Sequence, residues 1–238
     1  MLNKKVAIVT GASKMRPNII NNAIGRALSD RYDIITIDKH SGDIQIEISR
    51  ENQFELLNAI NDKLKGRPVW LLVNANAILT CDEKHPPHNK LFPNHSFPYL
   101  IMYDILMNNG LFVKAGFKPI HSVINIRSAF ADAIQKTTHN DTMVKAVING
   151  FTYKLAAEGV RCNTVSIGPV LMRTTSQKLT DEEIKMLYLQ IKTCPLDRTL
   201  MPEDVGDVVA MIDACKAISG QNIRADYGQH VSNNNLHR

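Results

Sequence analysis

The 238-residue sequence predicts an α/β fold in a single domain, residues 1–238, with helices covering both faces of a parallel β-sheet. Three observations predict this fold: short apolar runs recur along the chain, segments with helical spacing separate them, and the runs show little alternation of polar and apolar residues. Strands that are apolar on both faces are typical of parallel sheets buried between two helical layers. This is the doubly wound, Rossmann-type architecture, which binds its ligands at the carboxyl ends of the strands.

Seven apolar runs are predicted to be strands. They lie at residues 6–10, 34–38, 44–48, 69–75, 122–126, 160–168 and 221–226. The third run leads into a segment in which Phe54, Leu57, Ile60 and Leu64 recur at helical spacing.

Helical segments separate the predicted strands. The first helix ends near Ser29, the second follows Ser49 as its N-cap, and a long helix spans about 142–157. Thr180 and Glu183 are spaced as a capping box at the start of a further helix. The apolar face of that helix contains Ile184, Leu187, Tyr188 and Ile191. We expect this helix to be either a lid over a substrate pocket or a plain packing helix.

Composition limits the class of protein. The net charge of +5 and the pI of 9.0 permit an acidic ligand, but no lysine or arginine run is dense enough to predict nucleic-acid binding. No apolar stretch approaches the roughly 18 residues of a membrane helix, and the first residues resemble a strand rather than a signal peptide. Four separated cysteines, Cys81, Cys162, Cys194 and Cys215, are typical of reduced thiols. We therefore expect a cytoplasmic protein without a nucleic-acid or membrane partner.

Four segments in the C-terminal half resemble the short-chain dehydrogenase/reductase family. They read SVINIRS, MVKAVINGFTYKLA, GVRCNTVSIGPV and PLDRTLMPEDV followed by SGQNIRADYG, and the likeness runs from about Lys5 to Gly228. The resemblance implies an NAD(P)-dependent oxidoreductase of small carbonyl or enoyl compounds. It also implies a homodimer or homotetramer that pairs through helices around 100–117 and 142–157. We expect the lid or substrate loop at about 170–198.

The family's phosphate loop reads TGxxxGxG, and this chain carries a longer version. Gly11 matches the first glycine, Ala23 stands at the second position, and Gly25 matches the third, so the loop has eight extra residues. Enoyl-acyl-carrier-protein reductases resemble this chain in having a longer loop, and by that likeness Ser13 and Ile24 would contact the cofactor. The alternative is that the loop packs and binds nothing.

Two segments resemble the family's adenosine-binding positions. Asp38 ends the second predicted strand, where a carboxylate would accept hydrogen bonds from the ribose and repel a 2′-phosphate. This favours NAD over NADP, although Lys39 follows directly and weakens the preference. Glu47 and Ile48 stand where the family has an Asp-Val pair beside the adenine.

The nicotinamide side of the site is altered at several positions. Asn74 begins the equivalent of the family's NNAG segment, whose glycine is Ala77 here. Gly168 lies in the Pro-Gly turn, and Met172 stands where the family has a threonine. We therefore expect a dinucleotide site that is altered at Ala23, Ala77 and Met172.

The catalytic residues of the family are a serine, a tyrosine and a lysine. Ser128 matches the serine and Lys145 the lysine, but Asp141 occupies the position of the tyrosine. The wider enoyl-reductase spacing offers Thr138 instead. A phenol with a pKa near 10 can protonate a developing alkoxide, whereas a carboxylate with a pKa of about 3.9 is ionised and repels it. Conventional reduction should therefore be lost or redirected.

Several readings of the altered site stay open. Burial could raise the pKa of Asp141 so that it acts as an acid, or Asp141 could be the base of a cofactor-independent isomerase or dehydratase. Another side chain could fill the vacant role; the candidates are Tyr99, Tyr103, Tyr153 and His139. A non-catalytic binding or assembly subunit is the alternative from another class. The residues Cys81, Asp82, His85, His88 and His95 share one irregular loop, for which we expect a polar surface and no metal.

Overall fold

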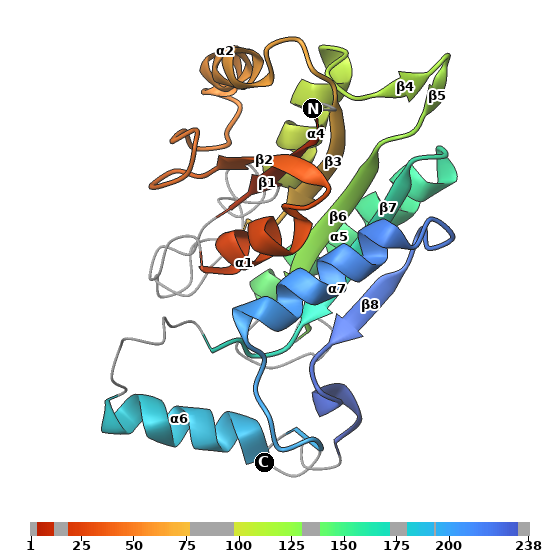
Figure 1. Cartoon of the computed structure of the whole chain (residues 1–238). Coiled ribbons are helices and arrows are strands. Elements are labelled where there is room, and N and C mark those ends of the chain that lie inside the picture. Colours follow the sequence, from red (N-terminus) through yellow and green to blue (C-terminus); the bar gives the residue numbers. More distant parts are fainter. Residues whose placement is uncertain are drawn as a thin grey trace.

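The structure is a computed structural model, shown in Figure 1. It describes residues 4–11, 19–76, 98–129, 139–171, 180–192 and 194–232. Within its helices, the side chains of residues 139–146, 183, 186 and 190 lie outside the description. The predicted contact Ser13 and the cysteine- and histidine-rich loop also lie outside the described residues.

Six parallel strands form the central sheet, in the order β2-β1-β3-β6-β7-β8. Their bounds are β1 Lys5–Thr10, β2 Tyr32–Ile37, β3 Val69–Asn74, β6 Ser122–Ser128, β7 Arg161–Ile167 and β8 Asn222–Ala225. The chain reverses its direction of travel along the sheet between β2 and β3, so β1 and β3 lie side by side at the switch point. This confirms the predicted α/β fold, and ligands of such sheets bind beyond this point.

Two helical layers cover the sheet. One face carries α1 (Ile19–Leu28) and α7 (Pro202–Ala214), which pack closely against each other (Figure 1). The other carries α2 (Gln53–Leu64), α4 (Pro98–Asn108) and α5 (His139–Ala157). Strands β1, β2, β3, β6 and β7 contribute to both apolar layers: on β1, Val6 and Ile8 face the α2/α4/α5 side, and Ala7 and Val9 face the α1/α7 side. The core therefore has two layers with the sheet between them.

Four further elements lie outside these layers. Helix α6 (Asp181–Lys192) and the 3-10 helix η3 (Gln229–Val231) lie on the side of the carboxyl ends of the strands. The short strands β4 (Lys114–Ala115) and β5 (Lys118–Pro119) form an antiparallel hairpin at the opposite end of the sheet (Figure 1). No helix among the described residues is long and apolar enough to cross a membrane.

The prediction of a strand at 44–48 is wrong. Only a single parallel bridge, Ile37 to Ile44, forms there. The chain before it is held in a loop by Asp43, whose Oδ2 accepts hydrogen bonds from the backbone N–H and the hydroxyl of Thr36 at 2.9 and 2.8 Å. Since these bonds occupy the edge of β2, the chain leaves the sheet after one contact.

One further prediction needs correction. Helix α2 begins at Gln53 with Asn52 as its N-cap, so Ser49 is not the cap; its hydroxyl instead accepts the backbone N–H of Asn52 at 3.3 Å. On α6, two residues of the predicted apolar face are partly exposed, Ile184 at 49% and Tyr188 at 58%, and its role as a lid or as a packing helix stays a prediction. The three described cysteines are free thiols, as predicted, with Cys162 and Cys194 buried and Cys215 exposed.

Candidate functional site

The carboxyl edge of the sheet gathers most of the predicted site. Gly11 follows β1, Asp38 follows β2, Asn74 ends β3, Ser128 ends β6 and Gly168 follows β7. The strand register brings their neighbours level with one another: Thr10 pairs with Ile37 and Asn74, and Ser128 pairs with Ile167. The sequence positions therefore converge at one edge of the fold.

Gly11 is required by close packing at this edge. Its φ of +96° is a conformation that favours glycine, and a Cβ atom there would lie 2.2 Å from the backbone nitrogen of Asn76. Its N–H donates to the carbonyl of Ile37 at 3.0 Å, and its carbonyl accepts from the side chain of Asn21 on α1. Asn21, which is buried, thus ties the start of α1 to the end of β1. The sequence offered no signal for this contact, because Asn21 lies among other polar residues of the long loop.

Ile24 and Gly25 do not lie in the loop. Both lie inside α1, where the side chain of Ile24 is completely buried in the core between the sheet and α7. A Cβ on Gly25 would meet only a methyl group of Ile34 at 3.7 Å, which is an ordinary contact. The predicted position of Ile24 in the loop is therefore wrong; because its side chain is fully covered, its contact with a cofactor falls to its backbone and stays a prediction.

Asp38 is buried and organises its own loop. Its Oδ1 accepts the backbone N–H groups of His40 at 2.7 Å and Ser41 at 3.2 Å, while Oδ2 receives no hydrogen bond from the described residues. The fixed carboxylate can still accept a ribose hydroxyl through Oδ2. Lys39, which weakened the predicted preference for NAD, pairs with Glu47 at 2.8 Å instead of facing Asp38.

Glu47 and Ile48 follow the single bridge in irregular chain. Glu47 is exposed, and its carbonyl accepts from the side chain of Asn52 at 3.2 Å. Ile48 is half-buried and packs on the edge of the α2/α4/α5 core. Their roles beside an adenine stay predictions.

Asn74 belongs to a buried polar row that crosses the sheet. The row comprises Thr10, Asn74, Asn125 and Thr164, which are directly paired on four neighbouring strands and are all fully buried. Asn74 donates to Asn125 Oδ1 at 2.9 Å and accepts from Thr10 Oγ1 at 3.4 Å. Its side chain is therefore committed to the sheet, so any contact of Asn74 with a cofactor falls to its backbone.

Helix α5 joins this row through Thr152. Asn125 Nδ2 donates to Thr152 Oγ1 at 3.0 Å, and the hydroxyls of Thr152 and Thr164 lie 2.7 Å apart. Asn125 lies three residues before Ser128, and Thr152 lies on the helix that carries Asp141 and Lys145. The row thus links the strand of the predicted serine to the helix of the predicted lysine, a connection that sequence reasoning missed.

Of the three candidate phenols, Tyr99 is the one that reaches the edge of the site. It extends from α4 into the interior, where its hydroxyl lies 2.8 Å from the carbonyl oxygen of Asn76 and 2.7 Å from that of Ile126. Burial raises the pKa of Tyr99 above its ordinary value. A phenol has one proton to donate, and here two carbonyls compete for it. Tyr99 therefore braces β3 against β6 and is poorly suited to protonate a substrate.

The other candidate phenols lie away from this edge. Tyr103 packs against Phe112 and Phe151, with ring centroids 5.5 and 5.6 Å apart, and burial raises its pKa to about 12. Tyr153 lies on α5 with its side chain 54% exposed. Neither ring approaches Ser128 through a described contact.

Ser128, Asp141 and Lys145 occupy neighbouring elements. Ser128 is half-buried at the last position of β6, and Asp141 and Lys145 lie one helical turn apart in the first half of α5. The side chains of Asp141 and Lys145 lie outside the described residues, so an ion pair between them stays a prediction. Gly168 is fixed by close contact, since a Cβ there would lie 2.9 Å from Cβ of Asp226.

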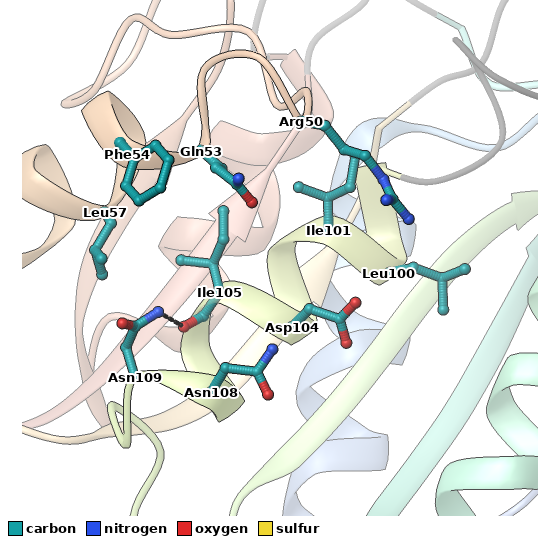
Figure 2. A pocket seen from close by; sticks show the side chains of 10 residues that line it. All are labelled: Arg50, Gln53, Phe54, Leu57, Leu100, Ile101, Asp104, Ile105, Asn108 and Asn109. Carbon is teal, nitrogen blue, oxygen red and sulfur yellow. Dashed lines mark hydrogen bonds between the residues drawn. The ribbon is translucent and has the colours of Figure 1, made fainter.

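A separate groove lies between α2 and α4, away from the carboxyl edge. It has a volume of about 470 Å³. Figure 2 shows Phe54 and Leu57 on the α2 side facing Ile101 and Ile105 on the α4 side, with Asp104 near its rim. Within the described part of the chain, no group of three or more histidine, cysteine, aspartate or glutamate side chains could hold a metal ion.

The sequence also matches a known family. The model of the family described as enoyl-(acyl carrier protein) reductase matches residues 110–230, slightly more than half of the chain. The chain belongs to this short-chain dehydrogenase/reductase family. The matched range contains Ser128, Asp141, Lys145 and Gly168, but not the phosphate loop.

Two curated members of the family are similar to part of this reductase-family chain. The enoyl-[acyl-carrier-protein] reductase [NADH] FabI of Bacillus subtilis is 31% identical over 116 residues, 48% of this chain and 39% of that protein. The FabI of Haemophilus influenzae is 33% identical over 96 residues, 38% of this chain and 36% of that protein. The matching part thus spans about two fifths or less of these relatives.

Solved structures extend the likeness in fold to nearly the whole chain. A 3-oxoacyl-[acyl-carrier protein] reductase from Brucella melitensis has a TM-score of 0.75 at 17% identity, covering 97% of this chain and 99% of that one. The aldohexose dehydrogenase of Thermoplasma acidophilum has a TM-score of 0.74 at 20% identity, covering 97% and 95%. An enoyl-[acyl-carrier-protein] reductase (NADH) from Aquifex aeolicus has a TM-score of 0.69 at 15% identity, covering 98% and 99%.

Proposed function

We propose that this protein is a divergent short-chain dehydrogenase/reductase that binds NAD and has lost or redirected the tyrosine-dependent reduction of small carbonyl or enoyl compounds. The observation that carries the proposal is Asp141, which stands where the family has its tyrosine. Tyr99 and Tyr103 support it, because one is held by two backbone carbonyls and the other packs in an aromatic cluster. Tyr153 is exposed on the flank of α5.

The residues at the carboxyl edge fit a dinucleotide. The free Oδ2 of Asp38 would accept a ribose hydroxyl, and its charge would repel a 2′-phosphate, which favours NAD. The backbone around Gly11 and the turn at Gly168 border the same edge. Ser13 and Lys145 complete the proposed contacts by resemblance. The cofactor, when bound, supplies a hydride acceptor or donor.

The chain's own residues would then control the transfer of a proton to or from the substrate. Ser128 would hydrogen-bond the substrate oxygen, and Lys145 would supply positive charge. Asp141, ionised near neutral pH, has no proton to give, so the loss of general acid catalysis lowers the rate by about 10²–10⁴. As a base, the same carboxylate would remove a proton next to a carbonyl, which is the alternative of an isomerase or dehydratase. A binding subunit without catalysis is the alternative from another class.

The proposal extends to assembly. Helix α4 is apolar nearly all round, and its groove with α2 leaves Leu57 and Ile101 only partly covered (Figure 2). A helix with this pattern is normally covered by a partner. We therefore propose a homodimer or homotetramer that pairs through α4 and α5. The segment 170–198 serves as a lid over a small-molecule substrate.

The lid proposal has support at both ends of the segment. Leu171 N–H donates to the carbonyl of Leu200 at 2.7 Å, and Leu200 N–H donates to that of Pro169 at 3.3 Å. These bonds hold the two ends of the segment together while α6 lies beyond them, with Tyr188 exposed. A segment clamped at its base can close over the carboxyl edge without disturbing the sheet.

Cofactor titration followed by turnover tests the proposal. Protein fluorescence with NADH and with NADPH should show saturable binding with a preference for NADH. Turnover should be absent or slow across a panel of carbonyl and enoyl compounds. No binding of either dinucleotide at millimolar concentration would refute the NAD-binding proposal and favour an assembly or cofactor-free role.

Two single variants test the catalytic part. Asp141→Tyr should gain reductase activity if the site uses the shorter family spacing, and Thr138→Tyr should gain it if the site uses the enoyl-reductase spacing. Asp141→Asn is the matched control, because it removes the charge without supplying a phenol. Fast reduction by the unmodified protein, at a rate that neither tyrosine variant raises, would contradict the loss of the acid.

A further inference from the structure

The hairpin of β4 and β5 presents an aromatic side chain to solvent. Phe117 stands at its tip and is fully exposed, at 105% of its reference area, and Ile120 beyond the hairpin is 45% exposed. Lys114 and Lys118 flank the tip and are also exposed. Figure 1 shows the hairpin projecting from the amino end of the sheet, opposite to α6.

The conformation of the turn does not explain why an aromatic residue stands at position 117. Lys114 pairs with Pro119 and Ala115 with Lys118, which leaves Gly116 and Phe117 as the two central residues. Gly116 has a φ of +62°, and Phe117 does not have a positive φ, so only the first central position requires glycine. The second position accepts small polar residues, so the turn does not require an aromatic ring there.

Cations surround the same end of the sheet. The loops that lead into the six strands, together with the first residue of each strand, hold nine lysines and arginines but only two acidic residues. The cations are Lys4, Lys5, Arg31, Lys65, Arg67, Lys114, Lys118, Arg161 and Lys216, and the acids are Asp30 and Glu158. Because all six strands are parallel, these positions meet at one edge.

Interactions with helix ends explain part of this excess of cations over acidic residues. The helices end at the same edge, and cations there offset the negative ends of their dipoles. Arg161, for example, donates to the carbonyls of Ile212 at 2.9 Å and Cys215 at 3.3 Å at the end of α7. Lys114 and Lys118 have no such role, since they lie on the hairpin and form no ion pair with the described residues.

We propose that this hairpin docks the protein onto an anionic lipid surface, with Phe117 inserted at the headgroup level and Lys114 and Lys118 contacting acidic headgroups. A convex tip with one aromatic ring fits a deformable surface, whereas a protein partner would have to supply a pocket of matching shape. Lysines near an anionic leaflet and an apolar side chain at its boundary act together in peripheral binding.

The proposed orientation leaves the carboxyl edge free. The hairpin lies at the amino end of the sheet, so Gly11, Ser128 and α6 would face away from the lipid (Figure 1). The sequence excluded a spanning helix but could not reveal this surface. Phe117 has no other aromatic residue beside it except Phe112 five positions earlier, and the fold alone brings Lys114 and Lys118 to the same edge as the other cations, of which Arg31, Arg161 and Lys216 pair with Asp213 and Arg67 with Asp33.

Co-sedimentation of the full chain with vesicles tests the proposal. Vesicles of phosphatidylcholine with about 30% phosphatidylglycerol should bind the protein, and pure phosphatidylcholine should bind it far less, since each lysine contributes about fivefold in partitioning. Phe117→Ser should lower the partition coefficient about fivefold, and Lys114→Ser with Lys118→Ser about 25-fold. Raising the salt concentration should weaken binding of the unmodified protein.

Matched variants elsewhere on the chain separate docking through the hairpin from nonspecific adsorption to the vesicles. Val231→Ser removes an apolar side chain that is 67% exposed in η3, on the carboxyl side of the sheet, and Lys185→Ser with Lys192→Ser removes two exposed lysines of α6. Neither should change partitioning. The proposal is overturned if the unmodified protein fails to bind the anionic vesicles, if the control variants lose as much binding as the hairpin variants, or if Phe117→Ser changes the oligomeric state while vesicle binding persists.

Discussion

His121 should make the protein sensitive to acid. The residue precedes β6 and is almost fully buried, with its ring stacked on Phe112 at 3.9 Å and an angle of 8°. Neither ring nitrogen makes a hydrogen bond of normal geometry with the described residues. Burial is the main cause that lowers the pKa of His121 from 6.5 to about 4; Lys114 lowers it further, and the carbonyl of Val113 opposes them.

The size of the effect follows from these two pKa values. Below pH 6.5 the unfolded chain binds a proton at His121 while the folded chain stays neutral until about pH 4. Above pH 6.5, His121 is neutral in both states and does not lower the free energy of unfolding. As the pH falls from 6.5 towards 4, only the unfolded chain gains the proton, so the free energy of unfolding decreases. The linkage relation gives a loss of about 1.4 kcal/mol near pH 5.5 and about 2.5 kcal/mol near pH 4.5.

The assay compares His121→Phe with the unmodified protein by urea unfolding between about pH 7.5 and 4.5. The variant keeps a flat ring on Phe112 but cannot bind a proton, and all other titrating groups cancel in the difference. Its free energy of unfolding should gain about 2.5 kcal/mol on the unmodified protein over this range. His40→Asn, at an exposed position, is the matched control. A constant difference between the two proteins across the range would refute the argument.

Three further substitutions test the packing around the site by urea unfolding near neutral pH. Tyr99→Phe should cost about 1–3 kcal/mol because it leaves two buried carbonyls without their donor. Thr152→Val keeps the shape but removes the hydroxyl that joins α5 to the polar row, at about 1–2 kcal/mol, and should be non-additive with Thr164→Val. Gly168→Ala should destabilise by about 1–3 kcal/mol through steric overlap, whereas Gly150→Ala, with open space around it, should stabilise α5 by about 0.5–1 kcal/mol.

For each substitution, one result would contradict the expected change in stability. Unchanged stability of Tyr99→Phe would show that water or backbone movement satisfies the two carbonyls. Strict additivity of the two threonine variants would show that their hydroxyls, 2.7 Å apart, do not interact. Equal effects of the two glycine variants would show that the carboxyl ends of β7 and β8 are not in tight contact.

Much of the fold could be predicted because its strands are short apolar runs separated by amphipathic helices. Six of the seven predicted strands exist, with β1, β6 and β7 close to their predicted bounds. The run at 44–48 failed because side-chain bonds from Asp43 compete with strand pairing, and sequence periodicity does not report such bonds. The hairpin of β4 and β5 was missed because each strand is only two residues long.

The candidate site was harder to predict than the fold. Motif positions located Gly11, Ser128 and Gly168 at one edge, since a parallel sheet brings strand ends together. Side-chain direction was not accessible from the sequence: the side chain of Asn74 is bonded inside the sheet, so its predicted contact with a cofactor falls to its backbone and stays a prediction. Tyr99 was a candidate for the vacant role, but the sequence could not show that its hydroxyl lies between the carbonyls of Asn76 and Ile126.

The polar row has a consequence for how the strands find one another. Strands that are uniformly apolar can slide past their neighbours at little cost, because every shifted arrangement still buries similar side chains. A slip of one residue in β6 would turn the amide of Asn125 away from Asn74 and Thr152 and into the largely apolar layer under α1 and α7. The polar row of Thr10, Asn74, Asn125 and Thr164 therefore favours the native strand register while the chain folds, because a mispaired sheet would bury these polar groups without their hydrogen-bond partners.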